Sequence, residues 1–449
     1  MEISRAIDHL APLGIGPQAS SPATEDGTGG LTAKKAAFAA ATGTAIEYYE
    51  FGVYGYMAST IGPLFFPSSN STASLLAILA VFGSAFLMRP VGGIVLGRLG
   101  DRIGRRGILL VTVIGMGIAT AAIGVLPTAS SVGIAAPIML LLIRLAQGFF
   151  AGGEVTGAAT YVAESAPEGK RGFYGAFTPV GVAIGGALAA AACGLLSAIL
   201  SPEEMRTWGW RVPFLLAIAM TVMSAIVRSR VEESLTFKQF QTRDKPPQAP
   251  LREVLTKHAR QVAKVSSLAF GQNVGYWVGL VFMNIYMTTY LKYDKTIVYW
   301  IMASVSLSMA LLMPFWGGLS DRWGRKRVLT IGFSGYMLLV WPMMVLMDQH
   351  SIALAALAMF VIALPLPVVQ SVGYPTYAEQ FPTRVRYTGM AFSFNIGAIL
   401  GGGLTPYLAT SLISSTGNLK APALLLVAAS LTSLLTLLTV RETSSDRLK

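Results

Sequence analysis

Five charged residues lie inside long apolar stretches of the sequence: Glu47, Glu50, Arg89, Arg144 and Glu154. A charged side chain is costly in hydrocarbon, so each of them marks a candidate functional site. Glu47 and Glu50 are three residues apart and would share one face of a helix. Arg144 and Glu154 are separated by about 15 Å along a helix, which prevents them from forming a simple pair.

These charges suggest proton-coupled chemistry. Three acids against two bases leave one negative charge unpaired, and an unpaired buried carboxylate takes up a proton. We expect ionised Glu50 to pair with an arginine. Protonation would then free that arginine for a substrate carboxylate, which a guanidinium holds with two hydrogen bonds. Glu47 could be the acid instead, and Glu154 could be an exit relay. The alternative is that all of them are static charge pairs between helices.

Cysteine and histidine usage argues against metal or redox chemistry. The chain has one cysteine, Cys193, and its three histidines (His9, His258 and His350) lie far apart in the sequence. No nucleophile–base set occurs within the apolar stretches. We therefore expect no metal, no cofactor and no enzyme activity.

The composition identifies the surroundings that must hold these charges. Hydrophobic residues make up 53% of the 449 residues and charged residues 12%, whereas soluble proteins carry roughly 25% charged residues. This excludes a soluble enzyme, a disordered chain and an ordinary nucleic-acid binder. Twelve apolar segments can be read as membrane spans. They cover residues 36–61, 73–97, 107–127, 136–160, 172–200, 210–228, 262–290, 296–317, 328–347, 351–377, 387–412 and 420–440.

The basic residues alternate between the two sides of these spans. Of the 34 Lys and Arg, 27 lie in the termini or in loops after even-numbered spans, five lie in the opposite loops, and two lie within spans. This bias predicts that both termini are cytoplasmic. The net charge of +12 is thus a topology signal, and we expect no nucleic-acid partner.

Two motifs recur at nearly one offset. The loop Gly-x-Leu-x-Asp-Arg-x-Gly-Arg-basic begins at Gly97 and again at Gly317, and an Ala-Glu pair at residues 163–164 recurs at 378–379. Each copy follows the matching span of a six-span set, which indicates an internal duplication. We predict bundles at 34–228 and 262–441, joined by a cytoplasmic linker at 229–261. Residues 1–33 are expected to be a disordered cytoplasmic tail, without a signal peptide, and 442–449 a second tail.

The duplicated loop resembles the signature of the major facilitator superfamily. The resemblance implies an all-α membrane protein with twelve transmembrane helices in two pseudo-symmetric six-helix bundles. In that family the loop helps to latch the cytoplasmic ends of the two halves. The residues that match such a latch are Asp101, Arg105, Glu164, Arg171, Asp321, Arg325, Glu379 and Arg386.

Further motifs resemble the metabolite:proton symporter family. They include Arg89-Pro90-Val91-Gly92-Gly93, Arg144-Leu145-Ala146-Gln147-Gly148-Phe149 and Gly209-Trp210-Arg211-Val212-Pro213-Phe214. The first span departs from the family, which usually has Glu-Trp-Tyr-Asp-Phe where this chain has Glu47-Tyr48-Tyr49-Glu50-Phe51. Members of this family carry organic acids such as citrate and shikimate, or proline and betaine.

We therefore expect a proton symporter that imports a small organic acid across a bacterial inner membrane, acting as a monomer embedded in lipid. The alternative substrate is a zwitterionic osmolyte such as proline or betaine. Osmosensing members carry a long carboxyl-terminal coiled coil after the last span. This sequence has nine residues after its last predicted span, and the difference favours the organic acid. A drug/proton antiporter and a transporter-like sensor are less favoured. Predicted substrate-binding residues are Arg89, Arg144, Tyr54, Asn273, Tyr276, Trp277, Gln370, Tyr374 and Asn395.

Overall fold

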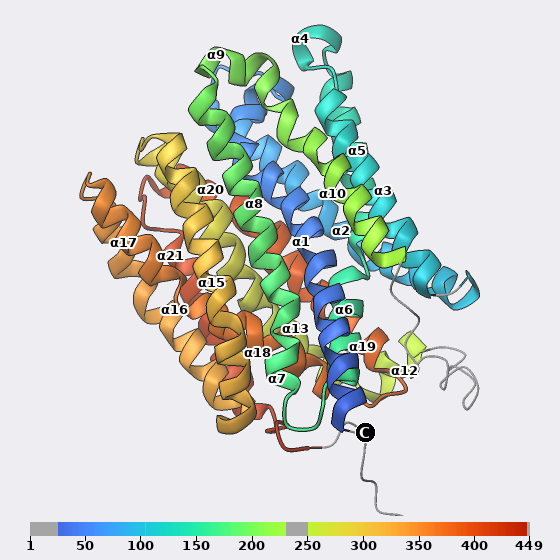
Figure 1. The fold of residues 1–449 in the computed structure, drawn as a ribbon. Coiled ribbons are helices and arrows are strands. Elements are labelled where there is room, and N and C mark those ends of the chain that lie inside the picture. Colours follow the sequence, from blue (N-terminus) through green and yellow to red (C-terminus); the bar gives the residue numbers. More distant parts are fainter. Residues whose placement is uncertain (1–25, 104, 230–249, 447–449) are drawn as a thin grey trace, which may run out of the picture.

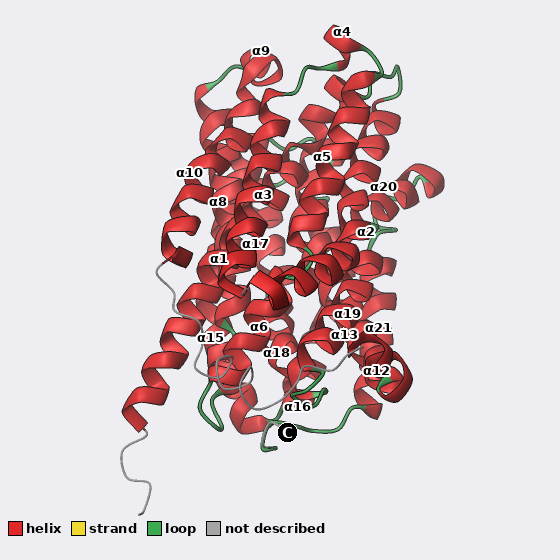
Figure 2. Cartoon of the chain, turned by 90° about the vertical axis from the view of Figure 1, so that its right-hand side faces the viewer, coloured by secondary structure: helices red, strands yellow, loops and turns green. Residues whose placement is uncertain are grey.

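The computed structural model describes residues 26–446 except residue 104 and residues 230–249. Every regular element among these residues is helical (Figures 1 and 2). The chain belongs to the all-α class, as predicted. Both the start of α1 and the end of the described chain lie at one end of the bundle, called the terminal face here; α4 and α9 mark the opposite face (Figure 1).

The amino-terminal half supplies six membrane-crossing units. They are α1 (Asp26–Phe65); α2 (Ser71–Ile103); α3 (Arg105–Val125); α5 (Ala135–Ala151) with α6 (Glu154–Ser165); α7 (Arg171–Gly175) with α8 (Phe177–Ile199); and α10 (Arg211–Ser229), preceded by the short α9 (Pro202–Glu204) and η1 (Met205–Gly209). The short α4 (Ala129–Val132) lies between α3 and α5.

The carboxyl-terminal half repeats this pattern. Its units are α13 (Ala259–Tyr276), η2 (Trp277–Phe282), α14 (Met283–Ile285) and η3 (Tyr286–Tyr290) as one broken helix; α15 (Lys295–Trp323); α16 (Arg325–Met347); α17 (Ile352–Ala363) with α18 (Pro365–Glu379); α19 (Arg386–Ala398), η4 (Ile399–Gly403) and α20 (Thr405–Thr416); and α21 (Ala423–Thr439). The twelve-helix prediction agrees with this order.

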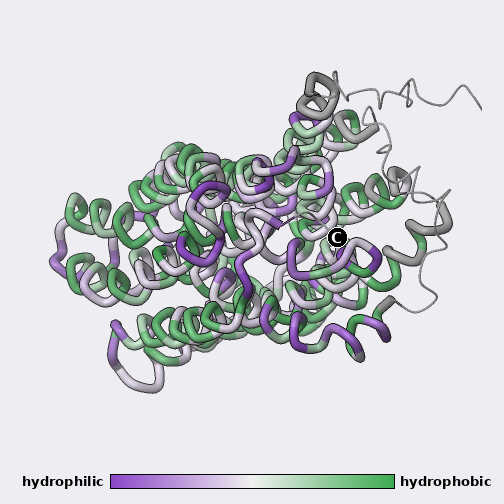
Figure 3. The backbone as a smooth tube through the Cα atoms, turned by 90° about the horizontal axis from the view of Figure 1, so that it is seen from below, coloured by the Kyte–Doolittle hydropathy of each residue, from purple (hydrophilic) through white to green (hydrophobic). Residues whose placement is uncertain are grey.

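By length and apolarity alone, seven of the described helices could cross a membrane, or eight if the bent pair Pro202–Gly209 and Arg211–Ile226 is one span. Helix α1 is not among them; two carboxylates lie in its middle. Large apolar side chains such as Ile118, Leu311 and Leu438 are strongly exposed on the bundle surface, as expected for helices that face lipid. Seen from the terminal face, hydrophilic segments gather near the middle, and hydrophobic helices surround them (Figure 3).

Two predicted boundaries differ from the structure. Helix α1 begins at Asp26, within the predicted tail, because the stretch that follows is rich in alanine, a strong helix former. A short helix, α12 (Pro250–Lys257), lies within the predicted linker. Residues 1–25, most of the linker and residues 447–449 lie outside the described residues, so the domain division stays a prediction.

The two halves meet along paired helices. Helix α15 packs against α7 and α8, α18 and α19 pack against α6, and α2 packs against η4 and α20. Within the amino-terminal half, α8 crosses α1 closely, because Gly181 and Gly185 leave no room for a Cβ beside the backbone of Ala41 and Ala45. These contacts place the middle of α1 beside both α2 and the broken helix that begins with α13.

Candidate functional site

A buried ion pair joins the first two helices. Arg89 Nη2 lies 2.8 Å from Glu47 Oε1, and both side chains are almost fully buried. The Arg89 guanidinium also lies over the rings of Phe51 and Phe86, at 4.6 and 4.7 Å from their centroids. Cation–π contacts of this kind gain strength where water is excluded. Glu47 therefore holds Arg89 directly.

Glu50 has different neighbours. The Thr120 hydroxyl lies 2.5 Å from Glu50 Oε2, Gln147 Nε2 donates to Thr120 Oγ1 at 2.6 Å, and Arg144 Nη1 donates to Gln147 Oε1 at 2.7 Å. This chain of contacts, the Glu50 relay, crosses from α1 through α3 to α5. Thr120 and Gln147 lie between the Glu50 carboxyl group and Arg144 in the described chain, so the pairing of ionised Glu50 with an arginine stays a prediction.

Arg144 is held mainly by rings. Its guanidinium lies 4.2 Å from the Tyr54 centroid, 4.9 Å from Phe51 and 5.2 Å from Phe82. Nη2 makes only a long contact of 3.4 Å with the Phe82 carbonyl, and Nε has no hydrogen-bond partner in the described part of the chain. The Tyr54 hydroxyl itself donates to the Ile78 carbonyl at 3.2 Å. Arg144 therefore keeps donor capacity for a ligand.

Aromatic rings from both halves surround Trp277. It contacts Tyr276 at 5.1 Å between centroids, Phe82 at 5.0 Å and Phe86 at 5.5 Å, and it stacks on Tyr48 at 6.2 Å. We call the group of Tyr48, Phe51, Phe82, Phe86, Tyr276 and Trp277 the aromatic cage. Among the described residues, nothing accepts the hydrogen bond that Trp277 Nε1 can donate.

Sequence reasoning named only Tyr276 and Trp277 in this cage. A signal for other members was present: Phe82, Phe86 and Arg89 follow a spacing of four and three residues, which places them on one face of α2. Tyr48 and Phe51 directly follow the two acids of α1. Thr120 and Gln147 were missed as well, because a threonine or glutamine inside an apolar helix gives no distinctive signal.

The predicted substrate-binding residues Asn273, Gln370 and Tyr374 contact other groups of the protein. Asn273 Nδ2 donates to the Ala269 carbonyl of its own helix at 2.8 Å, and Gln370 accepts from Gln272 at 2.6 Å. Tyr374 packs on Phe394 at 5.5 Å. These residues line the carboxyl-terminal side of the centre, where no ion pair is formed among the described residues.

The break between α5 and α6 contacts the carboxyl-terminal half of the protein. Asn395 Nδ2 donates at 3.0 Å to the Gly152 carbonyl, at the two-residue gap that separates the helices. Glu154 follows this gap, is buried, and lies in the first turn of α6, where the helix dipole favours a negative charge. The position of Glu154 at the start of α6 is therefore a physical reason for its burial that does not involve Glu50.

At the terminal face the duplicated motifs meet across the two halves. Arg171 lies 3.0 Å from Glu379, and Arg386 lies 3.0 Å from Glu164. Glu164 and Glu379 are duplicates of each other, as are Arg171 and Arg386. Each acid therefore pairs with the arginine of the other half.

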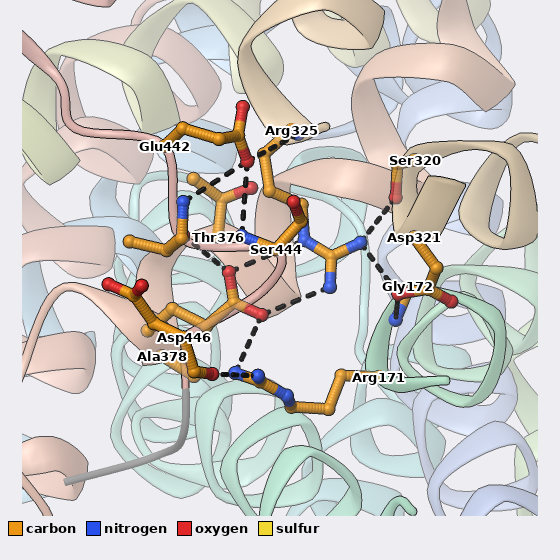
Figure 4. Close-up of polar contacts among 12 residues, drawn as sticks. Arg171, Gly172, Ser320, Asp321, Arg325, Thr376, Ala378, Glu442, Ser444 and Asp446 are labelled. Carbon is orange, nitrogen blue, oxygen red and sulfur yellow. Dashed lines mark hydrogen bonds and ion pairs between the residues drawn. The ribbon is translucent and has the colours of Figure 1, made fainter. Parts of the chain in front are cut away.

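Asp321 adds a third link at this face. Its carboxylate accepts hydrogen bonds from the backbone N–H groups of Gly172 and Phe173 at 2.8 and 2.9 Å, at the start of α7, and pairs with Arg325 at 2.9 Å (Figure 4). Arg325 also pairs with Glu379 at 3.0 Å. The structure thus brings six of the eight predicted latch residues together. The side chains of Asp101 and Arg105 lie outside the described residues.

The segment after α21 is fastened into the same network, which the sequence did not predict. Glu442 accepts from the backbone N–H groups of Arg325 and Lys326 at 2.9 and 3.1 Å, at the start of α16. The Thr443 hydroxyl donates to Glu379 at 2.6 Å, and the Asp446 carbonyl accepts from Arg171. Burial alone would raise the pKa of Glu442, but the hydrogen bonds from Arg325, Lys326 and Ser444 outweigh burial and lower it.

No group of three or more His, Cys, Asp or Glu side chains that could hold a metal occurs in the part of the chain that the structure describes.

Family models match both halves. Residues 36–258 match the model described as "Sugar (and other) transporter", and residues 265–449 match that of the Major Facilitator Superfamily. The chain is 36% identical to the proline/betaine transporter of Escherichia coli K12, covering 93% of this chain and 85% of that protein. It is 37% identical, with the same coverage, to the glycine betaine/proline/ectoine/pipecolic acid transporter OusA of Dickeya dadantii.

Two further proteins are similar to this chain. The shikimate transporter of Escherichia coli K12 is 34% identical over 93% of this chain and 97% of its own length. The solved proton:xylose symporter XylE of Escherichia coli is similar in fold, with a TM-score of 0.73 and 18% identity over 94% of this chain and 98% of that one.

Proposed function

The chain belongs to the metabolite:proton symporter family of the major facilitator superfamily, and from this membership we propose that it imports a zwitterionic osmolyte of the proline or betaine type, driven by protons. It is a multi-pass membrane transporter, not an enzyme. The relatives with the highest identity among those described above are named for proline and betaine. They favour the zwitterion over the organic acid that the sequence motifs first suggested.

The aromatic cage is the observation that carries the proposal. Aromatic faces attract quaternary ammonium groups, and several rings around one space are the usual means of recognising them. The cage lies directly beside two guanidinium groups, because Phe51 contacts both Arg89 and Arg144. A betaine has its ammonium group and its carboxylate separated by a single carbon. The juxtaposition of rings and guanidinium suits both ends of such a molecule.

Within this pair of arginines, Arg144 is the proposed anchor for the carboxylate. Glu47 already pairs with Arg89, whereas Arg144 has no carboxylate partner among the described residues and retains donor capacity. A guanidinium that presents two parallel N–H groups binds a carboxylate with charge-assisted hydrogen bonds.

Glu50 is the proposed proton carrier. It is fully buried and pairs with no cation in the described chain, which makes its carboxyl group the candidate to carry the coupling proton. When Glu50 is neutral, the positive charge of Arg144 is available to the substrate. When Glu50 loses its proton on the inward side, its negative charge repels the substrate carboxylate at Arg144 and promotes release, while Thr120 and Gln147 stay between Glu50 and Arg144.

The terminal face is proposed to be the cytoplasmic gate. The bias of basic residues predicts a cytoplasmic position for this face, and the reciprocal ion pairs tie the two halves together there. Release of substrate inward would require these pairs to separate while the centre stays intact, as in rigid-body alternating access.

Uptake by purified protein in proteoliposomes tests the proposal. With an inward proton gradient, labelled glycine betaine or proline should accumulate, and collapse of the gradient with a protonophore should abolish the accumulation. Choline, which has the quaternary ammonium but no carboxylate, should not accumulate. A protein that accumulates choline as well as betaine, or neither betaine nor proline, contradicts the proposal.

A small organic acid is the second candidate, favoured by the likeness to the shikimate transporter and by two guanidinium groups at the centre. Shikimate belongs in the same panel. Accumulation of shikimate without betaine or proline would assign the site to this second class.

A further inference from the structure

Three neighbours surround the hydroxyl oxygen of Thr120. Glu50 Oε2 lies 2.5 Å away, the Met116 carbonyl oxygen 3.0 Å away and Gln147 Nε2 2.6 Å away. A threonine hydroxyl can donate one hydrogen bond and accept two. Its donor capacity is therefore contested between Glu50 and Met116, while its acceptor capacity is only half used by Gln147.

The orientation of Gln147 is fixed by its other partner. Arg144 Nη1 can only donate, so the amide oxygen of Gln147 must face Arg144 and its NH₂ group must face Thr120. Gln147 thus always donates to Thr120. One lone pair and one proton of the Thr120 hydroxyl remain to respond to Glu50.

We propose, building on the proposed proton symport, that Thr120 is a positioning residue for the coupling proton. Its hydroxyl donates to Glu50 when Glu50 is ionised. When Glu50 is protonated, the hydroxyl accepts a hydrogen bond from Glu50 and turns its own proton to the Met116 carbonyl. Both protonation states then leave the Thr120 hydroxyl and Glu50 Oε2 hydrogen-bonded, without any movement of the backbone.

This rotation of the Thr120 hydroxyl matters because Glu50 has few other hydrogen-bond partners. Oε1 has no partner among the described residues, and no cation lies in direct contact. Without Thr120, an ionised Glu50 would turn to another donor, and Arg144 Nε is a donor without a hydrogen-bond partner among the described residues. Arg144 would then be withdrawn from the substrate. The titratable and charged groups that face Glu50 electrostatically are Glu47 and Tyr49 on α1, Arg144 on α5 and Glu154 on α6.

The test compares two variants of Thr120. Thr120→Val removes the hydroxyl at nearly constant volume, and Thr120→Ser keeps it. The ionised form of Glu50 loses a charge-assisted hydrogen bond in the valine variant, whereas the protonated form loses a weaker neutral one. The pH at which proton-driven betaine uptake is half maximal should therefore rise by about one unit in Thr120→Val. Thr120→Ser should restore the wild-type pH profile.

Thr221→Val is the matched control. Thr221 is buried in α10 and donates to the carbonyl of Ala217 four residues earlier at 2.7 Å, as Thr120 can to Met116, but no hydrogen bond joins it to an acid among the described residues. It should keep the wild-type pH profile. A Thr120→Val protein with the wild-type profile would overturn the proposal, as would a Thr221→Val protein with the same shift.

A second readout needs no transport. Infrared difference spectra across a pH titration should show the carbonyl band of protonated Glu50, identified by its loss in Glu50→Gln. In Thr120→Val this band should move to higher wavenumber, because the acid has lost its hydrogen-bond acceptor. An unmoved band contradicts the role of Thr120 even if the wild-type protein transports nothing, whereas failure of wild-type uptake alone contradicts only the proposed function.

Discussion

The centre of the molecule and its terminal face use the internal duplication in opposite ways. At the terminal face, duplicated acids and arginines make equivalent contacts across the two halves, Glu164 with Arg386 and Glu379 with Arg171. At the centre, the amino-terminal half supplies Glu47, Glu50, Arg89 and Arg144, and the carboxyl-terminal half supplies neutral polar and aromatic groups. The symmetric region suits a contact that must form and break as a unit. The asymmetric region suits recognition of a ligand whose two ends differ.

The two regions also differ in how completely their charges are satisfied. Arg325 at the terminal face contacts Asp321, Glu379 and Ser320, whereas Arg144 at the centre has rings, one amide and one distant carbonyl. A buried charge with incomplete partners costs free energy that a bound ligand can offset. The difference predicts which substitutions abolish binding and which shift the gate.

The largest effect is expected at Arg144. Arg144→Gln removes the proposed anchor and should reduce betaine uptake by about 10²–10³-fold, since two charge-assisted hydrogen bonds are lost. Initial rates in proteoliposomes measure it. Arg89→Gln removes the buried ion pair between Arg89 and Glu47, so it should lower the thermal stability of the protein. Arg144→Gln removes no such ion pair among the described residues and should lower the thermal stability less. Equal uptake by Arg144→Gln and wild type would remove Arg144 from the site.

Glu50→Gln separates coupling from binding. The amide mimics the protonated acid, so proton-driven accumulation should be lost while exchange of labelled for unlabelled substrate across the membrane persists. Exchange by the variant should also become independent of pH between 5 and 8, and wild-type exchange serves as the control. Intact accumulation would assign the proton to Glu47 or Glu154 instead.

Substitutions of Trp277 test the aromatic cage without changing a charged residue. Trp277→Leu should weaken apparent betaine affinity about 10-fold or more, because a desolvated cation–π contact contributes about 2 kcal/mol, and Trp277→Phe should retain part of it. The KM for betaine is the measurement. The KM for a substrate without a cationic group should change much less in the same variants. An equal change for both would assign Trp277 a packing role only.

The duplicated acids of the gate should not be equivalent. Glu379 binds Arg171, Arg325 and Thr443, whereas Arg386 is the ion-pair partner that the structure records for Glu164. Glu379→Gln should therefore favour the conformation open at the terminal face more than Glu164→Gln does. Labelling rates of a cysteine introduced at the gate would report this, with the wild-type sequence carrying the same cysteine as reference. Equal rates in the two variants would mean that the additional contacts of Glu379 are unimportant.

The smallest effect concerns Glu442, which caps α16. Glu442→Gln should lower the apparent Tm at pH 7 by about 1 °C, as expected for a lost cap of about 1 kcal/mol in a chain of this length. The pKa of Glu442 is lowered in the folded protein, so its stabilisation is fully present above the unfolded value of about 4.3 and is lost as pH falls through the folded value. The Tm difference should be constant from pH 7 to pH 5 and should shrink only below that range. A difference that disappears above pH 5 would contradict the cap.

Much of this architecture could be read from local properties of the sequence. The number of helices follows from apolar stretches, and the duplication follows from motifs at offsets of 220 and 215 residues. The five charges within the apolar stretches are all buried in the structure, and they could be noticed because a charge in such a stretch is conspicuous at any rotation of its helix. The start of α1 was misplaced because an alanine-rich segment without large apolar residues signals helix weakly by periodicity.

What only the tertiary structure decided is which of these charges meet. The sequence by itself determined that Glu47, Glu50, Arg89 and Arg144 would be buried at similar depth in three helices. It could not determine the rotation of each helix about its axis, which sends Arg89 to Glu47 and places Thr120 and Gln147 between Glu50 and Arg144. Rotation is set by the packing of many small contacts, such as those between α8 and α1, and no single residue encodes it.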